Sequence, residues 1–207
     1  MSGYECHLFI KTLGNCEEDI PCIPNNEENY ISFTKQIIID KFVNKDVRMV
    51  NVKRGLRFID SLRFVASILD KLSTNLEIDQ IINLKKYYSG NQLSLLFRKG
   101  VYPYDYVDCM KQIDQTSLPS KEAFYSKLSD EGITGEDYQH AQTVSKELSI
   151  VSMKDYHNLY NLSDVLLLAD VFEKFRNICM NHYGLNPAWN VSAPGLAWDA
   201  ALKITVV

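Results

Sequence analysis

The stretch DYHNLYNLSDVLLLADVFEKFRNICMNH, residues 155–182, is the segment around which we expect the fold to be built. From residue 162 onward, apolar side chains recur at the three- and four-residue spacing of an α-helix. They are Leu162, Val165, Leu166, Leu168, Val171, Phe172, Phe175, Ile178 and Cys179. A helix of roughly twenty such residues is stable in water only when its apolar side is packed. The sequence therefore predicts a long helix lying against a hydrophobic core.

Tyr160 and Asp164 lie near the start of this segment, four residues apart. On a continuous helix this spacing puts the phenol and the carboxylate on the same face, one turn apart. An apolar run follows Asp164 directly. A carboxylate in this position is either a charge favoured by the helix dipole near the N-terminus or a metal ligand beside a cleft. The residues by themselves leave both interpretations open.

Composition and length are those of a globular chain with one large domain or two small ones. There are 207 residues, of which 46% are hydrophobic and 23% charged. There is no apolar run long enough for a transmembrane helix and no secretory signal at the start, so we expect no membrane partner. Five irregularly spaced cysteines favour an intracellular chain with reduced thiols. None forms a C-x-x-C pair, which argues against a zinc site.

Positive charge is concentrated in one segment of an otherwise acidic chain. Residues 41–63 carry seven basic and two acidic side chains, a net charge of +5, whereas the whole chain has a net charge of −4. A basic segment of this kind is a candidate surface for phosphate groups. It is also typical of an edge strand, where lysine side chains discourage aggregation.

The first third of the chain predicts a β-hairpin. Residues 30–40 and 47–59 are rich in β-branched residues, and the polar residues between them predict a turn. Gly55 predicts a second turn or a bulge that leads into a third strand. Before the hairpin we expect a short helix over residues 4–13 and an acidic loop over residues 15–29.

The rest of the chain is predicted to be mainly helical. After the hairpin we expect a helix over residues 64–72, short elements at 81–84 and 92–97, and an irregular aromatic loop from residue 99. Further helices are predicted over residues 119–128 and 134–148, over the central segment, and from residue 192 onward. Thr134 and Ser152 have the spacing of N-caps with a carboxylate three residues later. Gly184 ends the central helix, and Leu128 is expected to point inward.

Four short sequences resemble motifs of one protein family. YNLSDVLLLADVF, from Tyr160, resembles the third exonuclease motif, Y-x-x-x-D, of family B DNA polymerases of the protein-primed type. FIDSLRFV, from Phe58, is similar to the S/T-L-x-x-h motif of that branch, and RKGVYPYDY, from Arg98, to its K-x-x-h motif. SGYECHLF, from Ser2, resembles the second exonuclease motif. The four occur in the family's order and span essentially the whole chain.

This resemblance implies a fold and a division of the chain. The expected fold class is α/β and helix-rich: a partial ribonuclease-H-like 3′–5′ exonuclease fold with a β-hairpin and several helices. Residues 1–183 would form most of the exonuclease domain, and residues 184–207 would begin the connection to a palm domain.

The resemblance also implies catalytic residues. Asp164 and Glu5 would be ligands of Mg²⁺ or Mn²⁺, and Tyr160 would orient the attacking water. Lys99 would face the phosphate charge that builds up in the transition state. Such an exonuclease holds two divalent ions between carboxylates.

Binding of single-stranded DNA is the second implied role, with a terminal protein as a further partner. Ser61 and Leu62 would hold the frayed primer end, and Tyr4 would stack on a base. Lys53, Arg54 and Arg57, in the basic segment, would contact DNA phosphates.

The sequence departs from the family pattern in ways that bear on activity. The first exonuclease motif, D-x-E, is absent, and Glu5 stands where the second motif has aspartate. The palm motifs D-x-x-S-L-Y-P and D-T-D do not occur. We therefore expect a polymerase fragment that neither extends DNA nor hydrolyses it efficiently.

Simpler roles compete with each of these assignments. Tyr160 fits a half-buried core phenol, Ser61 a helix N-cap and Lys99 a solvated loop lysine. Two other functions compete as well: a non-catalytic module that binds single-stranded DNA or a terminal protein, and a helical protein-interaction domain.

Overall fold

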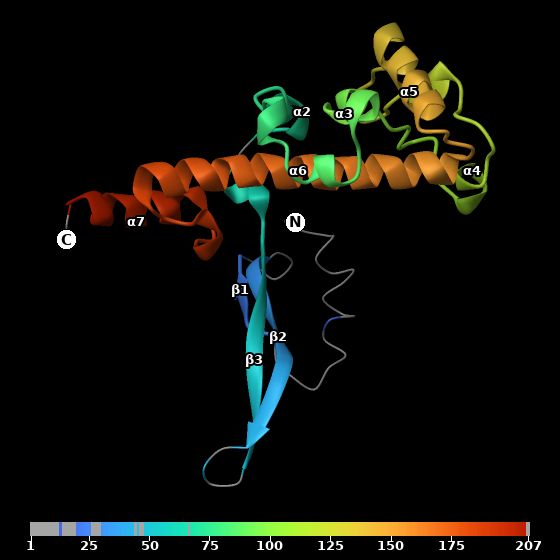
Figure 1. The fold of residues 1–207 in the computed structure, drawn as a ribbon. Helices are drawn as coiled ribbons and strands as arrows, with labels where there is room; N and C mark the ends of the chain where they lie inside the picture. Colours follow the sequence, from blue (N-terminus) through green and yellow to red (C-terminus); the bar gives the residue numbers. More distant parts are fainter. Residues whose placement is uncertain are drawn as a thin grey trace. The chain divides into compact units, whose positions relative to one another are not determined.

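The computed structural model describes residues 13, 20–25, 30–43, 45, 48–65 and 67–205. It is a mixed α/β structure with about 50% helix, as the sequence predicts, and it has a small three-stranded antiparallel sheet (Figure 1). The chain divides into two compact units. Unit 1 comprises residues 1–66 and 176–207, and unit 2 comprises residues 67–175.

The strands are β1 (Cys22–Pro24), β2 (Tyr30–Val43) and β3 (Met49–Ile59). The α-helices are α2 (Leu69–Ser73), α3 (Gly90–Leu96), α4 (Met110–Ile113), α5 (Gly135–Glu147), α6 (Met153–Tyr183) and α7 (Ala193–Thr205). Short 3-10 helices are η1 (Ser61–Arg63), η2 (Ile78–Gln80), η3 (Leu84–Lys86), η4 (Lys121–Phe124) and η5 (Pro187–Trp189). None of the described helices is both long enough and apolar enough to span a bilayer.

The sheet of unit 1 confirms the predicted hairpin and corrects its details. Figure 1 shows β2 and β3 as a long two-stranded ribbon, and β1 pairs with the beginning of β2. The predicted turn or bulge at Gly55 is wrong, because β3 continues through this residue, which lies opposite Gln36. The irregularity lies in β2 instead, between Ile38 and Asp40. A short third strand, β1, falls within the stretch predicted to be only a loop.

The long helix α6 confirms the central prediction, and both of its ends have the expected chemistry. Ser152 Oγ accepts a hydrogen bond from the Asp155 backbone N–H at 3.1 Å and donates one to the Asp155 carboxylate at 2.7 Å. At the other end, Gly184 adopts a φ of +61° and donates its N–H to the Met180 carbonyl at 2.9 Å. Only glycine adopts this left-handed conformation without strain, so the helix stops there.

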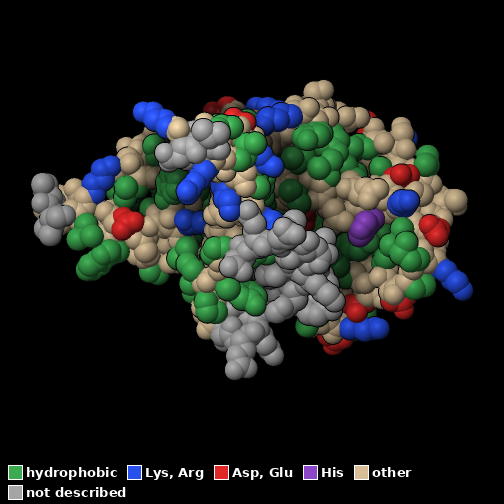
Figure 2. Space-filling view, turned by 90° about the horizontal axis from the view of Figure 1, so that it is seen from below, with side chains coloured by type: hydrophobic (Ala, Val, Ile, Leu, Met, Phe, Trp, Pro, Cys, Tyr) green, Lys and Arg blue, Asp and Glu red, His purple; other side chains and the backbone are tan. Residues whose placement is uncertain are grey.

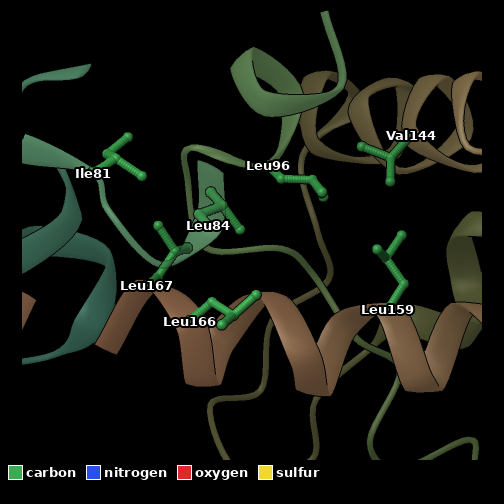
Figure 3. Packing of buried hydrophobic residues seen from close by; sticks show 7 residues of the cluster. All are labelled: Ile81, Leu84, Leu96, Val144, Leu159, Leu166 and Leu167. Carbon is green, nitrogen blue, oxygen red and sulfur yellow. The ribbon is translucent and has the colours of Figure 1, made fainter. Parts of the chain in front are cut away.

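The core of unit 2 lies along one side of α6, where Figure 1 shows α3 and α5. Figure 3 shows side chains of α6 pointing toward those of the neighbouring elements. The buried cluster consists of Ile81, Leu84, Leu96, Val144, Leu159, Leu166 and Leu167. Part of the predicted apolar stripe lies outside this core, because Leu162, Val165 and Leu168 are 36%, 64% and 38% exposed. The buried face is displaced around the helix and includes Tyr160 and Asp170.

Two predicted helices are wrong in extent. Only α2 falls in the helix expected over residues 64–72, because Ile68, directly before α2, is extended, with a ψ of 146°. The helix expected over residues 119–128 is only the single turn η4. There, Ser126 and Glu131 pair as a β-bridge and close a tight turn in place of the last helical turn. Leu128 lies in this turn and is 97% exposed, so its predicted inward position is also wrong.

Of the other elements, α5 and α7 follow the prediction, whereas α4 was not predicted. Thr134 caps α5 by accepting the Asp137 N–H at 3.0 Å. The short element expected at residues 92–97 overlaps α3, whereas the one expected at residues 81–84 overlaps η3 only at Leu84. Helix α7 begins directly after Ser192. The predicted helix over residues 4–13 lies almost wholly outside the described residues.

Candidate functional site

Tyr160 lies at the centre of an aromatic cluster in unit 2, where α6 meets the loop of residues 98–108. It is 7% exposed, and its hydroxyl is 2.7 Å from the Tyr104 hydroxyl. The ring centroids of Tyr102 and Tyr104 lie 5.0 and 6.0 Å from that of Tyr160. Burial, followed by the hydrogen bond with Tyr104, raises the pKa of Tyr160 above its ordinary value. The phenol therefore keeps its proton at neutral pH.

Gly100 allows the loop to come this close to the helix. A Cβ atom at this position would lie 3.2 Å from Cδ2 of Tyr160. This separation is tighter than ordinary van der Waals contact, so even an alanine would push against the ring. Glycine at this position thus brings its neighbour Lys99 to the head of α6.

A second chain of hydrogen bonds fixes Tyr102. Its hydroxyl is 2.7 Å from Nδ1 of His157, and Nε2 of the same ring is 2.9 Å from Nδ2 of Asn161. With the Asn161 amide donating to Nε2, the neutral imidazole carries its proton on Nδ1 and donates it to Tyr102. Neither Tyr104 nor His157 is predicted as a site residue. Tyr104 lies in the quoted sequence RKGVYPYDY but outside the K-x-x-h positions, and His157 precedes the Y-x-x-x-D motif.

Asp164 lies one turn after Tyr160 and is only partly exposed. Its Oδ1 atom is buried and has no hydrogen-bond partner. Burial raises the pKa of the carboxyl group, while the neighbouring Tyr160 hydroxyl and the positive charge of Lys99 oppose this effect. A buried acceptor without a donor costs free energy, so this arrangement is unfavourable unless a ligand supplies the donor.

A cavity of about 400 Å³ opens beside this cluster. Its wall includes the basic side chains of Arg98 and Lys99 and the rings of Tyr102, Tyr104 and Tyr160. The guanidinium of Arg98 is bound to the Asp137 carboxylate, whose pKa is lowered mainly by its hydrogen bond with Thr134. The wall also includes the acidic side chains of Asp70, Glu131 and Asp137, so the cavity combines charges of both signs with aromatic surface.

Replacing Asp164 by asparagine is expected to stabilise the protein at neutral pH. Because burial holds the folded pKa above the unfolded value of about 4, the wild type loses stability as the pH rises through this interval. Asparagine carries no charge and removes this loss. The gain is at most about 1 kcal/mol, since solvent reaches part of the group. Urea denaturation of both proteins at pH 4 and pH 7.5 measures this gain in the free energy of unfolding. If the wild type and Asp164→Asn lost the same amount of stability between the two pH values, the expectation would be wrong.

The structure brings together the residues from two of the four motifs. Tyr160 and Asp164 of one motif lie next to Lys99 and Tyr102 of another, and Lys99 is partly buried, not fully solvated. Tyr4 and Glu5 lie outside the described residues. The remaining site residues belong to unit 1: Lys53, Arg54, Arg57, Ser61 and Leu62.

In unit 1, the residues predicted to bind DNA lie on β3 and directly after it. Lys53 and Arg54 are exposed, and Arg57 donates to the Asn190 carbonyl at 2.6 Å. Ser61 is the first residue of η1, and Asp60 caps this turn by accepting the Leu62 N–H at 3.1 Å. The alternative role of Ser61 as an N-cap is therefore wrong, and Leu62 is 56% exposed.

Comparison with known proteins does not identify the chain. No protein family, no curated protein and no solved structure matched it. The resemblance to protein-primed polymerases therefore stays a prediction based on four short motifs.

The described residues do not fit the pair of metal ions that this resemblance implies. The unpartnered oxygen of Asp164 is a suitable ligand for Mg²⁺ or Mn²⁺. However, no group of three or more His, Cys, Asp or Glu side chains that could hold a metal occurs among the described residues. One carboxylate cannot hold two divalent ions. We therefore derive no catalytic step through a metal.

Proposed function

We propose that this chain is part of a protein-primed family B DNA polymerase, and that its site in unit 2 binds the 3′ end of single-stranded DNA. The observation that carries the proposal is the cavity whose wall includes Lys99, Tyr102 and Tyr160. These residues come from two motifs about sixty positions apart in the sequence, which resemble motifs of the same family. A chance resemblance in either motif gives no reason for the two to meet at one cavity.

The basic and aromatic part of the cavity wall suits a nucleotide, and the acidic side chains of Asp70, Glu131 and Asp137 form another part. The ammonium group of Lys99 is a compact positive charge that can approach a phosphate. The rings of Tyr102 and Tyr104 offer faces and edges on which a base can stack, whatever its identity. The cavity of about 400 Å³ has a volume suited to a nucleotide-sized ligand.

Binding without efficient hydrolysis is the activity that this donor set supports. Hydrolysis of a phosphodiester by two metal ions requires several carboxylates around them. Asp164 supplies one, and Glu5, the other residue assigned to the metal, carries a longer side chain than the family's aspartate. We propose that the same fragment has a partial ribonuclease-H-like exonuclease fold over residues 1–183, with Ser61 and Leu62 contacting the primer and a terminal protein as partner.

Titration of a labelled 20-nucleotide oligo(dT) into the protein tests this function. We expect binding that weakens steeply with salt, because each phosphate contact releases counterions. Lys99→Glu should weaken binding about tenfold at low salt. Lys154→Glu is the matched control, because Lys154 is exposed on α6, the helix that carries Tyr160, and is not part of the cavity wall. Fluorescence anisotropy at several salt concentrations gives both quantities.

Two results would overturn the proposal. Binding that is absent or insensitive to salt would favour a helical protein-interaction domain instead. Loss of 3′ nucleotides in the presence of Mn²⁺, abolished by Asp164→Ala, would show that the chain is an active nuclease. The same titration after changing Lys53, Arg54 and Arg57 to glutamate measures how much of the affinity the basic hairpin supplies.

A further inference from the structure

The outer part of the hairpin in unit 1 is a two-stranded ribbon. Strand β1 pairs only with residues 30–33 of β2, so among the described residues no third strand continues alongside residues 37–43 and 49–54. A two-stranded ribbon is marginal in water unless one of its faces packs against something apolar. The question is therefore which face of this ribbon is suited to be covered.

The strand register separates the side chains into two faces, because residues that are directly opposite point to the same side. One face, here called the apolar face, contains the pairs Lys35–Leu56, Ile37–Arg54, Asp40–Val52 and Phe42–Val50. Ile37, Leu56 and Phe42 on this face are 44%, 48% and 50% exposed. Figure 2 shows hydrophobic side chains close to Lys and Arg side chains on the surface seen from below.

The opposite face, here called the basic face, contains the pairs Thr34–Arg57, Gln36–Gly55, Ile38–Lys53, Lys41–Asn51 and Val43–Met49. All its charged side chains are basic, and it also carries the exposed hydrophobic side chains of Ile38, Val43 and Met49. Two copies of the chain that met through this face would bring their basic side chains together, at an electrostatic cost. Strand β3 contains three basic side chains and no acidic one, and Arg48 directly before it adds a fourth positive charge. Pairing of two copies through their β3 edges is therefore disfavoured by charge repulsion.

On the apolar face, by contrast, opposite charges accompany the hydrophobic side chains. Arg54 and Asp40 occupy neighbouring pairs and lie diagonally across the ribbon. Consider two copies whose apolar faces meet, with the ribbons crossing at a steep angle and a two-fold axis lying between the faces at the Arg54–Asp40 diagonal. In this arrangement Arg54 of each copy lies opposite Asp40 of the other. Lys35, the remaining charge on this face, is 8% exposed and already donates to the Leu13 carbonyl at 2.7 Å. The face is thus complementary to itself in both polarity and charge.

We propose that the chain forms a symmetric dimer through the apolar face of the β2–β3 ribbon, with Arg54 of each copy paired to Asp40 of the other. The ribbon presents only a few large apolar side chains, which is fewer than a permanent dimer interface buries. The dimer is therefore reversible and depends on protein concentration. The interface leaves the basic face of the ribbon open.

Sedimentation velocity on the full chain between about 1 and 100 μM tests this dimer. The weight-average mass is expected to rise toward that of two chains. Phe42→Asp should raise the dimer dissociation constant at least about tenfold, since it places a charge among the hydrophobic side chains of the apolar face. Met49→Asp is the matched control, because Met49 is 67% exposed near the same end of the ribbon but belongs to the basic face. Far-UV circular dichroism checks that both variants fold.

Charge exchange distinguishes this arrangement from unspecific association. Arg54→Asp or Asp40→Arg alone should weaken the dimer, and the two changes together should restore it, because each pair is then again of opposite sign. A chain that stays monomeric over the whole range would overturn the proposal. So would a dimer that Met49→Asp weakens as much as Phe42→Asp, or one that the double exchange fails to restore. If the chain stayed monomeric and bound anionic vesicles, and Phe42→Asp abolished that binding, the apolar face would be a membrane-binding surface and not a dimer interface.

Discussion

Replacing Asp170 by alanine is expected to lower the free energy of unfolding by about 4 kcal/mol. The Asp170 carboxylate is fully buried on α6 and accepts four hydrogen bonds from residues 82–84. Three come from backbone N–H groups, those of Ile82, Asn83 and Leu84, at 3.0, 2.8 and 3.1 Å. Alanine would leave these donors without an acceptor in the interior. Urea denaturation followed by circular dichroism measures the loss.

Asp170→Asn is the informative control for this prediction. Asparagine has almost the same shape as aspartate but only one acceptor oxygen, so it can accept hydrogen bonds from only some of the donors of residues 82–84. We expect it to lose less stability than alanine and more than a surface substitution. If Asp170→Ala proved as stable as the wild type, the carboxylate would not be what holds residues 82–84 against the helix.

Leu167→Ala is the second change with a large expected effect, at about 3–5 kcal/mol. Leu167 is 0% exposed and lies in the core cluster, where Figure 3 shows its side chain close to that of Leu84. Truncation removes apolar burial and leaves a cavity that the packed neighbours fill only in part. Thermal and urea denaturation both report it.

Leu168→Ala provides the matched control on the same helix. It makes the same chemical change one position later, where the side chain is 38% exposed and outside the cluster. We expect a loss of less than about 1 kcal/mol there. Equal losses at the two positions would mean that the buried face of α6 has been placed incorrectly.

Local chemistry explains which elements could be predicted. The caps at Ser152 and Gly184 and the β-branched strands act over a few residues, so their effect is visible in the sequence. The helix expected over residues 119–128 had comparable local signals, but the bridge between Ser126 and Glu131 competes with its last turn. The buried face of α6 depends on which neighbours pack against it. Leu162 and Leu166 are the same residue type in the same predicted apolar stripe, and only the tertiary contacts of α6 determine that Leu166 is buried and Leu162 is exposed.

The candidate site was predictable to the extent that its residues belong to motifs. Tyr160, Asp164 and Lys99 were singled out in this way, and they lie together. Tyr104 and His157 were not, because their hydrogen bonds join positions more than fifty residues apart in the sequence. Asp170 was overlooked although it lies in the quoted helix. Its position on the same side as Leu167 is a signal for a buried carboxylate that the sequence does contain.

The unpartnered Oδ1 atom of Asp164 predicts that a ligand reaching this atom stabilises the folded protein. A cation or hydrogen-bond donor that reaches Oδ1 of Asp164 removes the free-energy cost of a buried acceptor without a donor. Removal of this cost contributes to the binding free energy of the compound. By thermodynamic linkage, such a compound raises the melting temperature by an amount that grows with the logarithm of its concentration relative to its dissociation constant. A thermal-shift screen of divalent ions, nucleotides and amines would therefore rank candidates without an assay for activity. In Asp164→Ala the ranking of compounds that act at this atom should collapse.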